Sequence, residues 1–95
     1  MTGPVLRFQQ ALVLQALDLL TLPQQFGGRV PTAYDVHRFL GRVIQQNVIS
    51  KRCTELRELG LIADSGHTRP GSSGRRLICW SVTDAGRVAL REVEA

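Results

Sequence analysis

The stretch that decides the fold is NVISKRCTELRELGLI, residues 47–62. At about 100° per residue, its apolar side chains fall on one third of a helical wheel, namely Ile49, Cys53, Leu56 and Leu59. The opposite arc is polar, and its members are Asn47, Ser50, Lys51, Thr54 and Glu58, with Arg57 at its edge. Gly60 stops the helix, and an apolar β-favouring pair follows it. The pattern predicts an amphipathic helix joined directly to a strand.

The composition is that of a small globular protein with a basic middle. A chain of 95 residues with 43% hydrophobic and 21% charged residues can bury one modest core, so we expect a single domain over residues 1–95. The net charge is +4, and nine of the twelve basic residues but only four of the eight acids lie in residues 29–76. This distribution favours a polyanionic partner that meets the middle of the chain.

Several classes of function lack the residues that they need. Cys53 and Cys79 are expected to be reduced and buried, and no ligand spacing joins them to His37 or His67 in a zinc site. Residues 71–74, GSSG, are not followed by the Lys-Ser/Thr of a phosphate-binding loop, and no nucleophile and base are paired. We therefore expect no enzyme, metal, cofactor or small-molecule ligand. The absence of a leader or a membrane span predicts a cytoplasmic protein.

The first predicted helix runs from about Pro4 to Leu20 and is apolar over more than half of its wheel. Ala11 and Leu14 fall in or beside its polar arc, where a lone helix would expose them. They are either simple surface hydrophobes or a face for self-association, which makes this helix our candidate dimer element. The last helix is the alternative. Residues 21–28 are expected to form a connection, and Arg29-Val30 a very short strand.

The segment before the central helix predicts a second, shorter helix. Thr32 is expected as its N-cap, with Asp35 as the acid of a capping box, and Gly41 as its end. The side chains expected in the core from this helix and from the turn after it are Val36, Phe39, Leu40, Val43 and Ile44. Two helices joined by a short turn, the second with a polar and cationic outer face, form a helix-turn-helix pattern.

The segment after the central helix predicts a β-hairpin and a last helix. Residues 61–64 and 77–82 are expected as strands. Residues 65–75, rich in Gly and Ser, are expected as a flexible loop between them. Thr83 is then expected to cap a helix from Asp84 to about Val93, with Val88 and Leu90 as packing residues.

This order of elements resembles the winged helix-turn-helix family of small bacterial or phage-type regulators. The resemblance lies in residues 49–62, with an apolar residue, a Ser and basic pair and a closing Gly-Leu-Ile, and in Val82-Thr83-Asp84-Ala85-Gly86. It covers residues 31–93 and implies an α+β fold, with a three-helix core, a β-hairpin wing at about 61–82 and a C-terminal helix. The recognition helix would span about 46–59. One departure is a turn between the two helices that is about two residues longer than is usual in the family, so either the recognition helix begins earlier, near Gln45, or the turn is more open.

The resemblance implies double-stranded DNA as the partner, bound by a helix in the major groove. Gln46 and Asn47 carry amides that suit adenine, and Lys51 suits guanine or a phosphate. Phosphate or thymine-methyl contacts suit Ser50 and Thr54, and the remaining candidates for backbone and minor-groove contacts are Arg57, Arg38, Arg42, His67, Arg69, Arg75 and Arg76. A homodimer on two half-sites is expected, because one module reads few base pairs.

Two other functions stay open. A winged helix can act as an adaptor between proteins in a replication or transcription assembly, which apolar residues exposed at Ala11, Leu14 or the last helix would mark. Binding to RNA or to any nucleic acid without sequence preference is the third, and it is disfavoured because there are only five aromatic residues.

Overall fold

The computed structural model describes residues 6–21, 30–71 and 74–94 of the chain. Four helices and one antiparallel hairpin make up this part, in the order α1 (Phe8–Thr21), α3 (Ala33–Phe39), α4 (Gln46–Glu58), β1 (Ile62–Pro70), β2 (Arg76–Val82) and α5 (Asp84–Glu94). The class is α+β, as the sequence predicts, and the arrangement is compatible with a winged helix. The predicted helix start at Pro4 and most of the connection 21–28 lie outside the described residues, while Leu6 and Arg7 precede α1.

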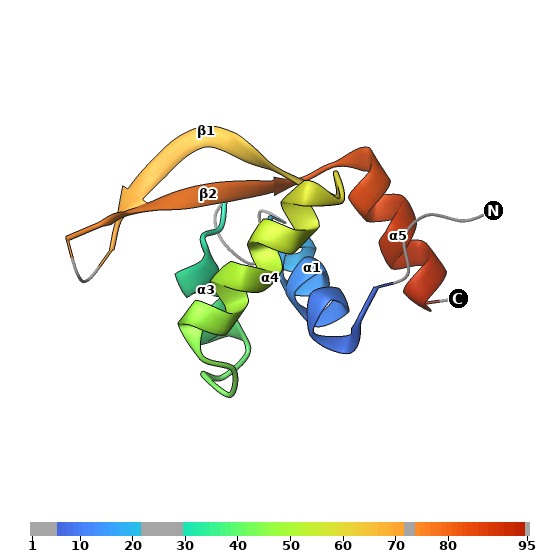
Figure 1. The fold of residues 1–95 in the computed structure, drawn as a ribbon, viewed down its shortest axis with the longest axis horizontal. Coiled ribbons are helices and arrows are strands. Elements are labelled where there is room, and N and C mark those ends of the chain that lie inside the picture. Colours follow the sequence, from blue (N-terminus) through green and yellow to red (C-terminus); the bar gives the residue numbers. More distant parts are fainter. Residues whose placement is uncertain (1–5, 22–29, 72–73, 95) are drawn as a thin grey trace.

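The helix α1 lies at the centre of the molecule. It contacts α3, α4, α5 and β2, while the hairpin runs across the helices and projects past α3 at the end away from α5 (Figure 1). The projecting hairpin makes the molecule elongated, with extents of 43 × 25 × 23 Å. In the described part of the chain, no helix is long and apolar enough to cross a membrane.

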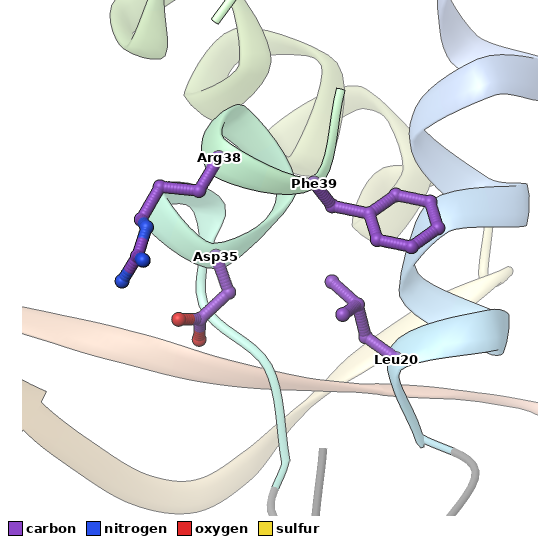
Figure 2. Close-up of a pocket in the computed structure, with 4 residues that line it drawn as sticks. All are labelled: Leu20, Asp35, Arg38 and Phe39. Carbon is purple, nitrogen blue, oxygen red and sulfur yellow. The ribbon is translucent and has the colours of Figure 1, made fainter. Parts of the chain in front are cut away.

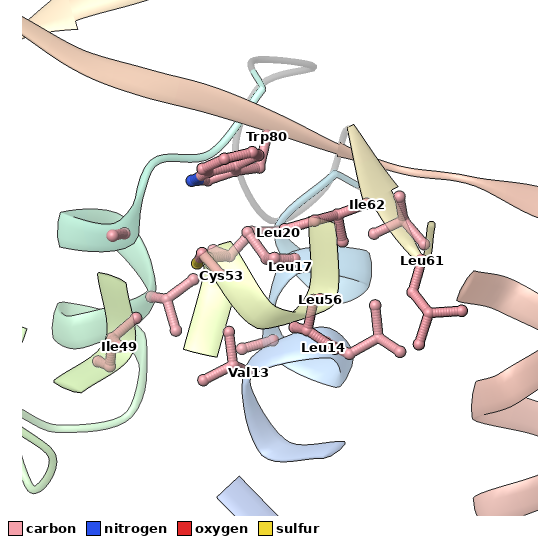
Figure 3. Close-up of a cluster of buried hydrophobic side chains, with 14 of the residues drawn as sticks. Val13, Leu14, Leu17, Leu20, Ile49, Cys53, Leu56, Leu61, Ile62 and Trp80 are labelled. Carbon is pink, nitrogen blue, oxygen red and sulfur yellow. The ribbon is translucent and has the colours of Figure 1, made fainter. Parts of the chain in front are cut away.

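The core is built on the apolar faces of α1 and α4. From α4 the buried residues are Ile49, Cys53 and Leu56, which are three of the four residues of the predicted stripe. They meet α1 and the start of the hairpin, as Figure 3 shows for Leu14, Leu17, Leu61, Ile62 and Trp80. Cys53 has no exposed surface, and desolvation by burial raises the pKa of its thiol to about 12, so it remains a neutral packing residue.

The expectation that Leu14 is exposed is wrong. Its side chain has no exposed surface, and Ala11 is half-buried, because elements of the same chain pack on several sides of α1. A wheel drawn for a lone helix cannot count those neighbours. The broad apolar coverage of α1 is therefore largely explained by contacts within one chain.

Other expected core residues lie further out. Phe39 is 42% exposed and Val43 is 84% exposed, while Leu40 and Ile44 are half-buried against the core. Val43 follows Gly41 and Arg42, which both have positive φ values (72° and 62°) and turn the chain at the surface. In α5, Leu90 is buried as expected, but Val88 is 48% exposed.

The hairpin is longer than the sequence predicts. Residues 65–70, expected in a loop, extend β1, and residues 68–70 pair with β2 as far as Pro70 opposite Arg76. Between the pairs Asp64–Trp80 and Thr68–Ile78, three residues of β1 face the single residue Cys79, so β1 bulges there. Gly66 supplies a φ of 88° within the bulge, and its N–H donates to Asp64 Oδ1 over 2.9 Å. A small, polar segment is thus a bulged strand with few buried side chains.

The predicted helix caps are confirmed. Thr32 and Asp35 form the capping box of α3, with Asp35 N donating to Thr32 Oγ1 and Thr32 N to Asp35 Oδ2. Thr83 Oγ1 accepts from Gly86 N over 3.1 Å and donates to the carbonyl of Gly60 over 2.7 Å. Thr83 therefore joins the end of α4 to the beginning of α5.

The segment before α3 makes one strand-like contact. Trp80 N in β2 donates to the carbonyl oxygen of Pro31 over 2.8 Å. Val30 is not in a strand, and Arg29, the other residue of the predicted short strand, lies outside the described residues. The contact holds the start of α3 against the hairpin.

Candidate functional site

The outer face of α4 is open to solvent. Because Ile49, Cys53 and Leu56 point into the core, the polar arc of the helix is left outside. Its exposed members are Asn47, Ser50, Lys51, Thr54 and Arg57, together with the acid Glu58. Gln46, the first helical residue, is half-buried. The helix thus presents amide, hydroxyl and cationic groups on one surface, as its periodicity predicts.

The start of α4 has no side-chain cap. Gln45 is the N-cap residue and makes no capping hydrogen bond. Asn47 Oδ1 accepts from the adjacent N–H of Val48 over 3.0 Å. Pairing of Asn47 with a base through its amide oxygen and nitrogen would therefore have to share or replace this exposed local hydrogen bond. The longer turn between α3 and α4 leaves the helix start at Gln46, as predicted.

The hairpin and α4 enclose a hollow of about 220 Å³. Ser50 and Thr54 enter it from α4, Arg76 enters from β2, and apolar side chains complete its wall, namely Ala33, Leu77, Ile78 and Trp80. The Nε of Arg76 donates to Thr68 Oγ1 across the hairpin over 2.6 Å, which orients the guanidinium. Thr54 Oγ1 donates to the Ser50 carbonyl over 3.2 Å and remains able to accept. Two hydroxyls and one cation from distant parts of the sequence thus line one hollow.

The other predicted cations of the hairpin are in different settings. Arg75 is exposed immediately before β2. His67 is exposed within the bulge, where its backbone N–H donates to Ser65 Oγ over 3.3 Å. Arg69, expected in a flexible loop, instead lies half-buried in β1 and forms an ion pair with Asp35 of α3. The structure therefore gives Arg69 a partner within the chain that the sequence did not suggest.

Arg38 and Arg42 are exposed near the turn that precedes α4. The turn is held by two hydrogen bonds to His37, whose Nδ1 lies 2.7 Å from the Ile44 carbonyl and whose own carbonyl accepts from Arg42 N over 2.9 Å. His37 thus has a structural role. Among the described residues, Arg42 is the one non-glycine residue with a positive φ.

Arg42→Gly is expected to raise the free energy of unfolding by up to about 1 kcal/mol. A left-handed conformation costs a side-chain-bearing residue about 1–2 kcal/mol, and the greater freedom of glycine in the unfolded chain cancels part of that gain. Urea denaturation measures the change, with Arg38→Gly as the control, because that glycine would lie inside α3 and should destabilise. A lower stability for Arg42→Gly would show that the Arg42 side chain contributes to the fold.

A polar cluster lies on the side of α4. Arg52 Nε pairs with Glu55 over 3.2 Å. The same carboxylate accepts from Nε2 of Gln10, a nearly buried residue of α1, over 2.9 Å. This cluster joins α1 to α4 and removes Arg52 from the outer face. The presence of Gln10 on the largely apolar α1 was the one feature of the sequence that could have indicated this contact.

Two further hollows lie beside α3. One of about 300 Å³ is lined by Leu20, Asp35, Arg38 and Phe39 (Figure 2). The other, of about 280 Å³, lies between α3 and the hairpin and includes Asp35 and Arg69. Across the described parts of the chain, no group of three or more His, Cys, Asp or Glu side chains is placed to hold a metal ion.

Comparisons of the chain with models of protein families, with curated proteins and with solved structures find no match.

Proposed function

We propose that this protein is a winged helix-turn-helix regulator that binds double-stranded DNA in a sequence-specific manner. In this proposal α4 is the recognition helix in the major groove, and the hairpin β1–β2 is the wing on flanking phosphates or the minor groove. The observation that carries the proposal is the hollow that is lined by Ser50 and Thr54 of α4 and by Arg76 of the hairpin. A phosphate backbone that follows the exposed face of α4 would pass this hollow.

The distribution of charge supports the same proposal. Lys51 and Arg57 are exposed on α4, Arg38 and Arg42 are exposed near its start, and Arg75 and Arg76 are exposed on the hairpin. About five phosphate contacts of this kind would give a log–log dependence of affinity on salt with a slope of about −4 to −5. A slope of this size distinguishes binding to phosphates from a protein–protein contact that involves no charges.

The deciding experiment is selection from a random duplex library followed by sequencing. Enrichment of a palindrome would support both sequence-specific binding and a homodimer on two half-sites. Phe8, at the start of α1, is 78% exposed, so α1 remains our candidate for the dimer contact. No enrichment at all would count against the proposal and favour an adaptor.

An adaptor between proteins is the second candidate, and exposed apolar side chains favour it. Val88 on α5 is 48% exposed and Val43 is 84% exposed. The burial of Leu14 removes one of the residues expected to mark this function. Mutation of Val88 to Asp should abolish an adaptor contact through α5 and leave duplex binding unchanged.

Arg75→Ala combined with Arg76→Ala is expected to weaken binding to every duplex and to reduce the magnitude of the salt slope by about 2. Each phosphate contact contributes about 0.9 to that slope, and two cations are removed. Affinity is measured by fluorescence anisotropy on selected and unrelated duplexes between low and moderate salt.

The matched control is Arg7→Ala combined with Arg91→Ala. Both residues are exposed, with Arg7 before α1 and Arg91 on α5, so they lie outside the proposed DNA-binding surface. Their loss changes the net charge by the same amount as the loss of Arg75 and Arg76. If both double variants flatten the slope to the same extent, the hairpin makes no local phosphate contact.

A further inference from the structure

Asp35 serves two parts of the fold with one carboxylate oxygen. Its Oδ2 accepts from Thr32 N over 2.8 Å and from Thr32 Oγ1 over 3.1 Å, which caps α3, and it also accepts from Arg69 Nη2 of β1. The Asp35 side chain is 12% exposed and that of Arg69 30%. Figure 2 shows the carboxylate of Asp35 directed from α3 toward the passing strands. One oxygen thus connects a rigid helix start to the hairpin.

Arg69 lies in the outer half of the hairpin, so its ion pair with Asp35 fixes the position of that half relative to α3. The bulge at residues 65–67 separates it from the base of the hairpin. A bulge bends a strand and interrupts its ladder of hydrogen bonds, so fewer hydrogen bonds fix the angle of the outer half. Arg69 faces Leu77 in the register, beside Arg76. Holding Arg69 therefore also holds Arg76 in the hollow beside α4.

We infer that Asp35 is a positioning residue for nucleic-acid binding, which acts through Arg69 to hold Arg76 opposite Ser50 and Thr54. The inference rests on the proposed function. It predicts an effect opposite in sign to that of simple electrostatics, because removal of an acid from a cationic surface should by itself strengthen binding to a polyanion. The sign of the effect therefore distinguishes positioning from net charge.

Asp35→Asn is expected to weaken duplex binding about five- to tenfold, although the net charge rises from +4 by one unit. The amide oxygen of Asn can still accept from Thr32 N, so the α3 cap remains, whereas its hydrogen bond to Arg69 loses the negative charge that makes the ion pair strong. Asp64→Asn is the matched control, because Asp64 is an exposed acid of β1 whose oxygen also accepts one backbone N–H. The control should bind equally well or slightly more tightly. Equal or tighter binding by Asp35→Asn would overturn the inference.

A double-mutant cycle tests whether Asp35 acts through Arg69. If it does, the variant that combines Asp35→Asn with Arg69→Gln should bind no more than about twofold more weakly than Arg69→Gln alone. A merely structural role for Asp35 would instead give losses that multiply. Multiplied losses would overturn the inference.

A measurement without nucleic acid separates this inference from the proposed function. Spin labels on Arg75→Cys and Glu58→Cys, both exposed positions, report the distance between the hairpin and α4, and the buried Cys53 and Cys79 should resist labelling. Asp35→Asn should broaden the distance distribution, whereas Asp64→Asn should not. An unchanged distribution would overturn the positioning role. Broadening in a protein that binds no duplex would confirm the anchor, but it would overturn the proposed function and with it the role of Asp35 in binding.

Discussion

Lys51→Ala combined with Asn47→Ala is expected to reduce the preference for a selected duplex over an unrelated one by about 100-fold. Contacts from side chains to base edges each discriminate by roughly 1–3 kcal/mol, and both residues are exposed on the outer face of α4. Affinity for unrelated duplexes should fall much less, because the phosphate contacts of the hairpin remain. Competition binding with both duplexes measures the ratio.

The fold should survive this double substitution, because neither side chain contributes to the core. A thermal melt that matches the unmodified chain is the control for stability. Glu58→Gln, another exposed position of α4, is the control for charge, and it should strengthen binding to both duplexes equally. If the sequence preference survived the loss of Lys51 and Asn47 together with that of Arg75 and Arg76, the assignment of α4 as recognition helix would be wrong.

Gly86→Ala is expected to lower the free energy of unfolding by about 2–3 kcal/mol. A methyl group at this position would overlap the carbonyl oxygen of Leu61 and would lie 2.8 Å from Val82 Cγ1. The Leu61 carbonyl cannot easily move, because it accepts from Thr83 N over 3.0 Å. Helix propensity alone predicts the opposite effect, an increase of nearly 1 kcal/mol in the free energy of unfolding.

Urea denaturation gives the sign of the effect directly. Ala85→Gly is the matched control, since Ala85 is exposed in the same turn of α5, and its substitution should cost only about 0.5–1 kcal/mol. A more stable Gly86→Ala protein would contradict the close packing of α5 against the start of the hairpin. In the predicted Val-Thr-Asp-Ala-Gly junction, Thr83 supplies the cap and Gly86 permits the close approach.

Burial on α4 shows how far periodicity can be trusted. Three of the four residues in the predicted stripe are buried, and the polar arc is exposed, because α4 packs on the core with one side only. In α1 the same reasoning failed at Leu14, because several elements surround that helix. A wheel describes one helix and predicts burial well only when the helix has a single buried face.

The hairpin shows where prediction of secondary structure from residue type fails. Gly66 and its small polar neighbours predicted a loop, because such residues are poor strand formers. The structure makes them a bulged strand, in which backbone pairing replaces side-chain burial. The ion pair between Arg69 and Asp35 could not be predicted from the sequence either. Asp35 is 34 positions away from Arg69 and already had a predicted role in the α3 cap.

Local patterns in the sequence determined the helices, the caps of α3 and α5, and the polar face of α4, because these depend on residues within about four positions of one another. The tertiary structure decided which side of α1 is buried, how far the hairpin extends, and which cation meets the hydroxyls of α4. These features depend on contacts between segments far apart in the chain. Arg76 lines the same hollow as Ser50 and Thr54 only after the hairpin has packed against the helices, so the composition of the hollow beside α4 follows from that packing.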